Sequence, residues 1–386
     1  MPNWLSRLTG GQGARPAETK AAPVHHLVRI DSLSPAEWTA AGLGGLGQAG
    51  FARNPVVYRC VRMVAEAANR VPFRIEEGGR RLAEHPALAL LRRPNARQSG
   101  SEMLEMVYAH LMVAGNAYLD AAIIDGAVKG LHVLRPDRVK VIAGPDGWIT
   151  GYEHTAGGRT TRLRQDSLPI ARVLHMSLMN PLDDHYGLSP LDAARQAIDL
   201  HNASANWNKA LLDNSARPSG ALVYTTGGHL TQEQFERLKS ELEDGFSGSR
   251  NAGRPMVLEG GLEWRAMALS PRDMDFIEAR NGAARDIALA FGVPPMLLGI
   301  PGDNTYANLV EASRGLWRQT IIPLVRRVAD DLSFWLAPAF GEGIEIIPDF
   351  DAVEALAEDR AQLWRRVSEA GFLTDAEKRA MLGVGE

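Results

Sequence analysis

The sequence of 386 residues has only one cysteine, Cys60, and no long apolar run. A single cysteine excludes an intrachain disulfide and is typical of a reducing compartment. No stretch of about 18 uncharged apolar residues occurs, so the sequence predicts no transmembrane helix. The first 20 residues also lack an apolar core of signal-peptide length. We therefore expect a protein that is made in the cytoplasm and has no membrane partner.

An excess of positive charge is missing as well. The chain has 42 Lys and Arg residues against 46 Asp and Glu residues, which gives a net charge of -4. Proteins that hold DNA tightly are usually basic, because their affinity comes from neutralising phosphates. The composition therefore indicates either that DNA is no partner or that its contact with this chain is weak. Weak contact suits a conduit, since many strong phosphate contacts would hold the duplex in place.

Motifs for nucleotide binding are absent or out of context. No Gly-Lys-Ser or Gly-Lys-Thr occurs, so the sequence has no P-loop. Residues 42–47 read Gly-Leu-Gly-Gly-Leu-Gly and match the dinucleotide pattern G-x-G-x-x-G. That pattern requires a strand before it and a helix after it, and neither is predicted here. A linker is favoured, and we expect no cofactor.

The candidate metal ligands and nucleophile favour structural roles. His175, Asp183, Asp184 and His185 lie within one short segment, but their spacing matches no zinc template. Cys60 lies in a segment rich in Val, Met and Ala, where a thiol packs as a small hydrophobe. We therefore expect no metal site and no catalytic residue.

One histidine and three tryptophans also have two possible interpretations. His201 lies among asparagines on a predicted helix, which favours a polar helix face or a subunit contact over a catalytic base. Trp317, Trp335 and Trp364 occur at helical spacing with Leu and Val. Core packing or a subunit interface is favoured over stacking on nucleic-acid bases.

The first half of the chain predicts an α+β domain. Asn54 is an N-cap followed by Pro55, and it begins a helix that ends near Asn69. A strand over Val71–Glu76 leads into a Gly-Gly turn. Ser99 and Glu102 form a capping box for a helix that ends at Gly115. Residues 117–176 alternate in short runs with turn residues between them, which predicts antiparallel hairpins.

The region after residue 188 predicts two helices around a small insert. Ser189 caps a helix that runs to about Asn214. A strand over Ser219–Tyr224, a short helix capped by Thr231 with Gln234, and a strand pair over Arg254–Ala268 then follow. The insert therefore covers residues 216–268 and is α/β.

The second of these helices begins at Ser270 and Pro271. Ile277, Ala284, Ile287 and Phe291 recur at helical spacing and predict its buried face. Gly292 predicts its end, because glycine readily adopts the left-handed conformation of a helix C-terminus.

A hinge, a loop and a bent helix are predicted next. Pro294 and Pro295 prevent the helix from continuing, and with Gly292 and Gly299 they form the predicted hinge. Residues 299–305 form a small, polar segment punctuated by glycine, which predicts an exposed loop. Pro323 lies inside the following helix and predicts a bend there, since proline lacks one backbone donor.

Several short segments, taken together, cover most of the chain, from about residue 50 to residue 385. Each is unspecific alone, and their order makes the set specific. The segments are Asn54-Pro55-Val56-Val57-Tyr58-Arg59-Cys60-Val61, His85-Pro86-Ala87-Leu88-Ala89-Leu90-Leu91, Gly115-Asn116-Ala117-Tyr118-Leu119, Tyr186-Gly187-Leu188-Ser189-Pro190-Leu191, Phe291-Gly292-Val293-Pro294-Pro295-Met296-Leu297-Leu298-Gly299 and Asn308-Leu309-Val310-Glu311.

With this ordered set, the chain resembles the portal proteins of tailed bacteriophages of the lambda-like siphovirus and prophage type, including those of gene transfer agents. The resemblance implies an α+β portal-protein fold. The implied parts are a flexible N-terminal arm (1–50), a wing (51–188), a stem helix (189–215), a small α/β clip (216–268), a second stem helix (269–294), a tunnel loop (295–308), a kinked wing helix with a strand (309–348), and a helical C-terminal crown (349–386).

The resemblance also implies a function. Copies would form a homo-oligomeric ring, expected to be a dodecamer, at one vertex of the capsid in the virion, after assembly in the host cytoplasm. Double-stranded DNA would be packaged and ejected through the ring with weak, non-specific contact, nearest to Gly302, Asp303, Asn304, Thr305 and Tyr306. The implied partners are the major capsid protein, the large terminase subunit and a head–tail adaptor protein.

A hypothesis from another class is a soluble monomeric or dimeric enzyme with an unrecognised active site. The missing motifs argue against it. The oligomeric state distinguishes the two hypotheses, because a ring with a central hole is expected only for the first.

Overall fold

The computed structural model of the chain describes residues 47–166, 169–213, 220–224, 231–234, 236–237, 240, 262–266, 276–302 and 305–383. All of them belong to one unit, Trp38–Glu386. The predicted N-terminal arm lies mostly outside the described residues. Folded structure begins slightly earlier than predicted, because Gly47–Phe51 form a short π-helical turn (η1) in which Gly50 is buried.

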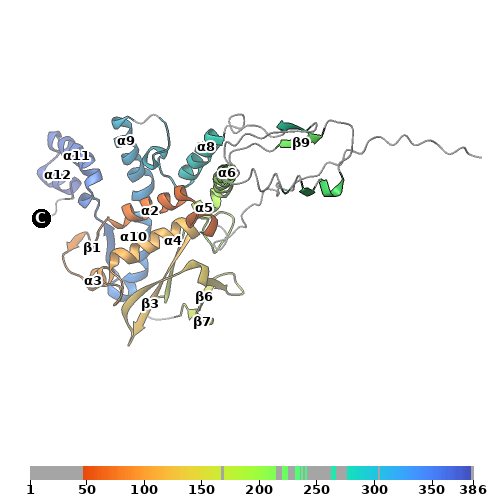
Figure 1. Ribbon diagram of the computed structural model, residues 1–386. Helices are drawn as coiled ribbons and strands as arrows, with labels where there is room; N and C mark the ends of the chain where they lie inside the picture. The colour runs from red at the N-terminus through yellow and green to blue at the C-terminus, as the bar shows by residue number, and fades with distance from the viewer. Residues whose placement is uncertain are drawn as a thin grey trace, which may run out of the picture. The chain divides into compact units, whose positions relative to one another are not determined.

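The first helices form where their caps predict them. Helix α2 (Pro55–Asn69; Figure 1) begins after Asn54. The Asn54 side chain accepts hydrogen bonds from two backbone N–H groups of the first turn. Helix α4 (Gly100–Ala114) has the predicted capping box and ends at Gly115 in the left-handed conformation. Both predictions are confirmed. A shorter helix, α3 (Pro86–Arg92), lies between them in the sequence.

Antiparallel hairpins follow α4, as predicted. One sheet has β3 in its centre, with β4 and β8 on either side, and a second has the order β5-β6-β7. The glycines of the predicted turns, Gly126, Gly157 and Gly158, have positive φ angles, which suits tight hairpin turns. The strands are β3 (Asn116–Ile124), β4 (Ala127–Leu134), β5 (Val139–Ala143), β6 (Ile149–Ala156), β7 (Arg159–Arg164) and β8 (Val173–Ser177), with a 3₁₀ turn at Pro136–Arg138.

A third sheet joins distant parts of the chain. Strand β1 (Phe73–Glu77) pairs with β2 (Arg80–Leu82) and also with β11 (Ile344–Pro348). The free edge of β11 is closed by a helix residue, because Ile346 donates its backbone N–H to Ser333 Oγ at 2.8 Å. This closure removes an exposed edge that other strands could join.

The region after residue 188 has two helices and a strand pair. A single helix was predicted from Ser189, but the chain forms α5 (Pro190–Ala193) and then α6 (Arg195–Asp213). Strands β9 (Gly220–Tyr224) and β10 (Leu262–Ala266) are antiparallel partners. Thr231 and Gln234 exchange the two predicted capping hydrogen bonds. Other residues of the predicted clip lie outside the described ranges.

Helix α8 (Phe276–Ala290) begins within the predicted helix, whose proposed cap, Ser270 with Pro271, lies outside the described residues. Ala284, Ile287 and Phe291 are buried, as predicted. Ile277 is not, because its side chain is 75% exposed. The residues around it are also exposed, so the first turns of α8 extend beyond the core.

A long helical segment follows in three pieces, α9 (Tyr306–Leu316), a π-helical turn η5 (Trp317–Ile321) and α10 (Ile322–Phe340). Pro323 lies in the first turn of α10, directly after the π turn. Its missing N–H therefore falls where the regular helical hydrogen-bond pattern is already interrupted. The predicted bend at Pro323 stays a prediction, and α10 contains a second proline, Pro338.

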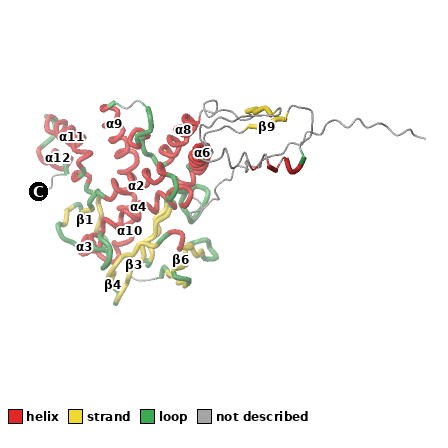
Figure 2. The backbone as a smooth tube through the Cα atoms, in the orientation of Figure 1, coloured by secondary structure: helices red, strands yellow, loops and turns green. Residues whose placement is uncertain are grey.

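The chain ends in two short helices, α11 (Ala357–Glu369) and α12 (Asp375–Met381), after 3₁₀ turns at Phe350–Ala352 (η6) and Glu354–Leu356 (η7). Figure 2 shows these two helices side by side. The main hydrophobic core lies elsewhere and contains residues of α2, α4 and α10, with Trp317 and Trp335 buried in it. A smaller cluster lies against β6 and contains Tyr118 and Tyr152.

Candidate functional site: the α8–α9 junction

Helix α8 ends in a Schellman motif at Gly292. The N–H of Gly292 bonds the carbonyl of Leu289 at 3.0 Å, and the N–H of Val293 bonds the carbonyl of Ala288 at 2.9 Å. Val293 is buried beside this turn, in keeping with the hydrophobic contact that often accompanies this motif. The end that the sequence predicted at Gly292 is therefore the end that the structure has.

Glycine is required at position 292 for two independent reasons. Its φ angle is +64°, in the left-handed region that side chains rarely adopt. A Cβ atom there would lie only 2.6 Å from Thr320 Oγ1. The same hydroxyl donates to the Gly292 carbonyl oxygen at 2.7 Å. Residue 292 is thus pressed against the π turn that precedes α10.

A second closed turn follows within the predicted hinge. Pro295–Leu298 form a 3₁₀ turn (η4) that ends at Gly299, with φ +72°. Ile300 donates its N–H to the Pro295 carbonyl at 3.3 Å and is buried. Hydrogen bonds and buried side chains therefore hold the hinge residues in place. Motion of the hinge stays a prediction.

The predicted loop is anchored at both of its ends. Arg285 of α8 donates a hydrogen bond to the Pro301 carbonyl oxygen. Thr305 caps α9 by accepting the N–H of Asn308 at 3.3 Å. Gly302 is exposed, and Tyr306 is the first residue of α9. Asp303 and Asn304 lie outside the described residues.

An ion-pair cluster on α9, which the sequence analysis did not identify, joins this helix to the C-terminal helices. Arg314 bonds Glu311 at 2.6 Å, contacts Glu358 and lies 3.8 Å from Asp359. Arg318 reaches the same Asp359 at 2.9 Å. Glu358 and Asp359 lie more than 40 residues from their arginine partners in the sequence, so no local pattern indicated the contact with α11. It attaches α11 to the helix that begins at the loop.

A buried polar contact connects α6 to the start of α2. The Asn54 amide donates to His201 Nδ1 at 3.1 Å and to Asn202 Oδ1 at 3.0 Å. Asn202 in turn donates to the Ala49 carbonyl at 2.8 Å. Burial lowers the pKa of His201, with the Arg280 charge adding to this effect. A neutral imidazole can accept from Asn54, so His201 serves packing between helices.

The surroundings of the other candidate residues indicate structural roles. Burial raises the pKa of Cys60 to about 12, which keeps its thiol protonated and unreactive. His175 stacks on the Tyr118 ring, and its Nε2 lies 2.9 Å from Asn116 Oδ1. Asp183 accepts the N–H groups of His185 and Tyr186, both at 2.8 Å, within its own loop. No group of three His, Cys, Asp or Glu side chains in the described ranges is arranged to hold a metal ion.

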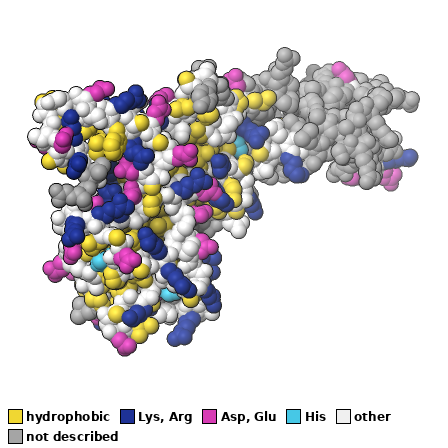
Figure 3. Space-filling model, turned by 90° about the vertical axis from the view of Figure 1, so that its left-hand side faces the viewer, with side chains coloured by type: hydrophobic (Ala, Val, Ile, Leu, Met, Phe, Trp, Pro, Cys, Tyr) yellow, Lys and Arg dark blue, Asp and Glu magenta, His cyan; other side chains and the backbone are white. Residues whose placement is uncertain are grey.

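The described surface carries charges of both signs. Figure 3 shows basic and acidic side chains interspersed over one face of the molecule. Within the part of the chain that the structure covers, no helix is both long and apolar enough to cross a bilayer. These features agree with the composition, in which acidic residues slightly outnumber basic ones.

The comparisons with known proteins agree on one family. The family model described as phage portal protein matches residues 55–383. An uncharacterized protein of Rickettsia bellii (strain RML369-C) is 43% identical over 338 residues, which cover 86% of this chain and 87% of that protein. The portal protein of Enterobacteria phage HK97 is 24% identical and covers 84% of this chain and 77% of its own length.

Solved structures of a gene transfer agent particle contain a similar chain. One is the neck of the empty particle, computed with C6 symmetry, and another is the neck of the native particle, computed with C12 symmetry. In both, the matching chain is 48% identical and covers 92% of this chain and 96% of itself, with TM-scores of 0.70 and 0.69. The protein therefore belongs to the phage portal protein family, with the α+β portal fold, and is a subunit of the ring at the capsid vertex through which DNA passes.

Proposed function

We propose that this chain is the portal subunit of a gene transfer agent or a closely similar phage-like particle, and that twelve copies form its ring. The observation that carries the proposal is the 48% identity, over nearly the whole chain, with a neck chain of a gene transfer agent computed with C12 symmetry. Head-to-tail repetition of one interface closes such a ring and leaves a central hole.

The parts of the chain take the roles that the family resemblance implies. Residues 51–188 act as a wing against the major capsid protein. Helices α6 and α8 act as stem, and residues 216–268 act as a clip between them. The clip binds the large terminase subunit during packaging and a head–tail adaptor protein afterwards. Residues 349–386 form the crown. The strand pair β9–β10 and the bracketing helices support this division.

Residues 302–306 face the channel and contact DNA weakly. The loop lies between two anchored helix ends, with Arg285 holding Pro301 and Thr305 capping α9. Weak contact also follows from the net charge of -4, because few phosphates can be neutralised. A loop held at both ends can follow a moving duplex without binding it.

The chain does not hydrolyse ATP in this proposal. It has no P-loop, so the energy for packaging comes from the terminase. The ring itself serves as a channel and a docking site: it keeps the channel open at the vertex while the motor binds to its outer face. Assembly takes place in the host cytoplasm, and the mature ring stays in the particle.

Electron microscopy of purified particles tests the proposal. We expect density for this chain at a single vertex, as a twelve-fold ring around a central channel. The clip should point away from the capsid interior, toward the motor or tail. A chain that is absent from particles, or a compact monomer that turns over a small substrate, would refute the proposal and favour the enzyme hypothesis.

A further inference from the structure

The side-chain amide of Asn54 is held in one orientation by the backbone of α2. Its oxygen accepts the N–H groups of Val56 and Val57 at 3.0 and 3.2 Å, and a backbone N–H can only donate. The amide nitrogen therefore points toward α6, where it lies 3.1 Å from His201 Nδ1 and 3.0 Å from Asn202 Oδ1. Both of its hydrogens are used by these two contacts, while the oxygen caps α2.

This orientation fixes the tautomer of His201. The Asn54 amide nitrogen is a donor, so His201 Nδ1 must accept, and the single proton of the neutral imidazole lies on Nε2. A second proton, on Nδ1, would place two donors 3.1 Å apart with no acceptor between them. The contact between α2 and α6 therefore requires a neutral His201.

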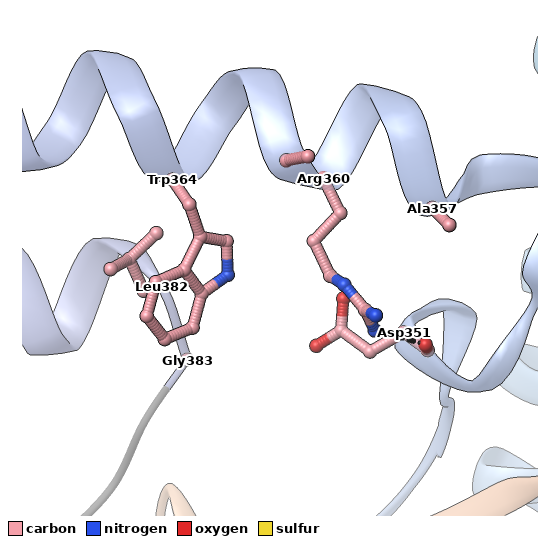
Figure 4. Close-up of a pocket in the computed structure, with 7 residues that line it drawn as sticks. Asp351, Ala357, Arg360, Trp364, Leu382 and Gly383 are labelled. Carbon is pink, nitrogen blue, oxygen red and sulfur yellow. Dashed lines mark hydrogen bonds between the residues drawn. The ribbon is translucent and has the colours of Figure 1, made fainter.

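Burial makes this requirement strict. Asn54 is 1% exposed and His201 is 3% exposed, so water cannot replace a lost partner. Polar contacts at the surface are different. Arg360 and Asp351 are exposed, and Figure 4 shows their charged groups side by side at a groove of α11, where water can solvate either one. At Asn54 and His201, the gain of one proton must instead be met by a rearrangement within the chain.

No negative charge among the described residues compensates a proton on His201. Helix α6 packs against α8, α5 and η1. Burial lowers the pKa of His201, and the charge of Arg280 on α8 lowers it further. Asp192 of α5 accepts a serine hydroxyl at 2.7 Å, and η1 has no titratable side chain. Next to the α2 cap lies Arg53, which is also positive. His201 therefore gains a proton only as pH falls below the ordinary histidine pKa of about 6.5.

Two rearrangements would separate the facing donors. If the imidazole ring turned over, a ring C–H would face Asn54 and the buried charge would lose this partner, which is costly. If the Asn54 amide turns over instead, its oxygen accepts the Nδ1–H of His201 in a charge-assisted hydrogen bond. Only the second rearrangement pairs Asn54 with the buried charge, and it takes the acceptor away from Val56 and Val57.

We propose that His201 and Asn54 form a pH-sensitive latch between α6 and α2. When His201 is neutral, Asn54 caps α2; when His201 is protonated, Asn54 turns toward it and α2 loses its cap. The turned amide also stops donating to Asn202, which links α6 to the Ala49 carbonyl. All of these groups lie within one chain, so the latch goes beyond the portal function and does not rest on it.

Hydrogen exchange of the full chain tests the latch. The backbone N–H groups of Val56 and Val57 should be protected at pH 7, and their protection factors should fall by up to about 10-fold per pH unit below pH 6.5, since the uncapped state takes up a proton. His201→Asn keeps an acceptor near the Nδ1 position but does not titrate, so its protection should be equal at pH 7 and pH 5. Nitrogen-15 NMR of the unmodified chain should show His201 Nδ1 unprotonated at pH 7.

Two controls separate the latch from a general loss of stability. His132→Asn changes an exposed histidine of β4 and should leave the pH dependence in the first turn of α2 unchanged. The amides of Val328 and Leu332, which are buried in α10, report global unfolding. The latch is overturned if first-turn protection is equal at pH 7 and pH 5, if it falls only in parallel with that of α10, if His201→Asn shows the same fall, or if NMR finds a proton on Nδ1 at pH 7. Each of these results leaves the portal function standing.

Discussion

Substitution of Gly292 by alanine should destabilise the protein, because it strains the backbone and displaces the Thr320 hydroxyl. Alanine in the left-handed conformation costs roughly 1–2 kcal/mol. Its Cβ would lie 2.6 Å from Thr320 Oγ1, so the hydroxyl must move and lose its bond to the Gly292 carbonyl. That loss costs about 0.5–1.5 kcal/mol. Together these two costs should lower the free energy of unfolding by about 1.5–3.5 kcal/mol.

Gly315→Ala is the matched control with the opposite expected sign. Gly315 lies in α9, with no positive φ and no atom within 4 Å of an added Cβ. Alanine there should stabilise the protein by about 0.5–1 kcal/mol, because glycine is entropically costly within a helix. Urea unfolding followed by circular dichroism measures both changes.

A double-mutant cycle tests the cause. Thr320→Ala removes the hydroxyl, and with it both the hydrogen bond and the clash. Its cost in the Gly292→Ala background should therefore be smaller than its cost alone by at least 0.5 kcal/mol. The reasoning is refuted if Gly292→Ala and Gly315→Ala shift the urea midpoint equally, or if the two substitutions at 292 and 320 are additive.

Three further predictions concern stability and helix attachment. Burial lowers the pKa of His110 and of His175 to about 4. As pH falls below about 6.5, the unfolded chain therefore takes up protons first, and the free energy of unfolding declines by up to about 1.4 kcal/mol per pH unit per histidine. In urea titrations between pH 7 and pH 5, the variant His110→Gln/His175→Gln should lose less stability than the unmodified chain, and an unchanged slope contradicts this account. Arg314→Ala should speed amide hydrogen exchange in α11, because it removes the ion pair with Glu358. Arg135→Ala removes only the local ion pair with Asp137 and should leave exchange in α11 unchanged. Equal exchange in both variants would show that the cluster does not hold α11. Asn54→Ala should lower stability by about 2 kcal/mol, because it removes an N-cap and the buried contact to His201, and Asn202→Ala, which keeps the cap, should cost less.

Local sequence signals predicted the elements that are controlled by neighbouring residues. Asn54, the Ser99–Glu102 pair and Gly115 act within a few residues of themselves, so their caps are visible in the sequence. Gly292 belongs to this group, since a helix end depends on the backbone conformation of one residue. The predictions that differ from the structure depend on packing. Ile277 has helical periodicity with buried residues, but among the described residues it lies outside the core and is 75% exposed.

In the candidate site, too, some features were predicted from the sequence and others were not. The loop and its flanking turns were predicted from glycine, proline and polar residues. The contacts of Arg314 and Arg318 with α11, the Asn54–His201 contact and the Thr320–Gly292 contact were not, since their partners are between 28 and 147 residues apart. Periodicity within a segment carries no information about such partners.

The sequence by itself determined where α2 and α4 begin and end, the end of α8 at Gly292, the hairpin region and, through an ordered set of short segments, the portal family. These properties depend on backbone conformation and on residue order, which are local or linear. Only the tertiary structure decided how β11 joins β1, which helix faces are covered, and how α9 is attached to α11. Those contacts follow from three-dimensional packing, in which residues far apart in the chain exclude water together.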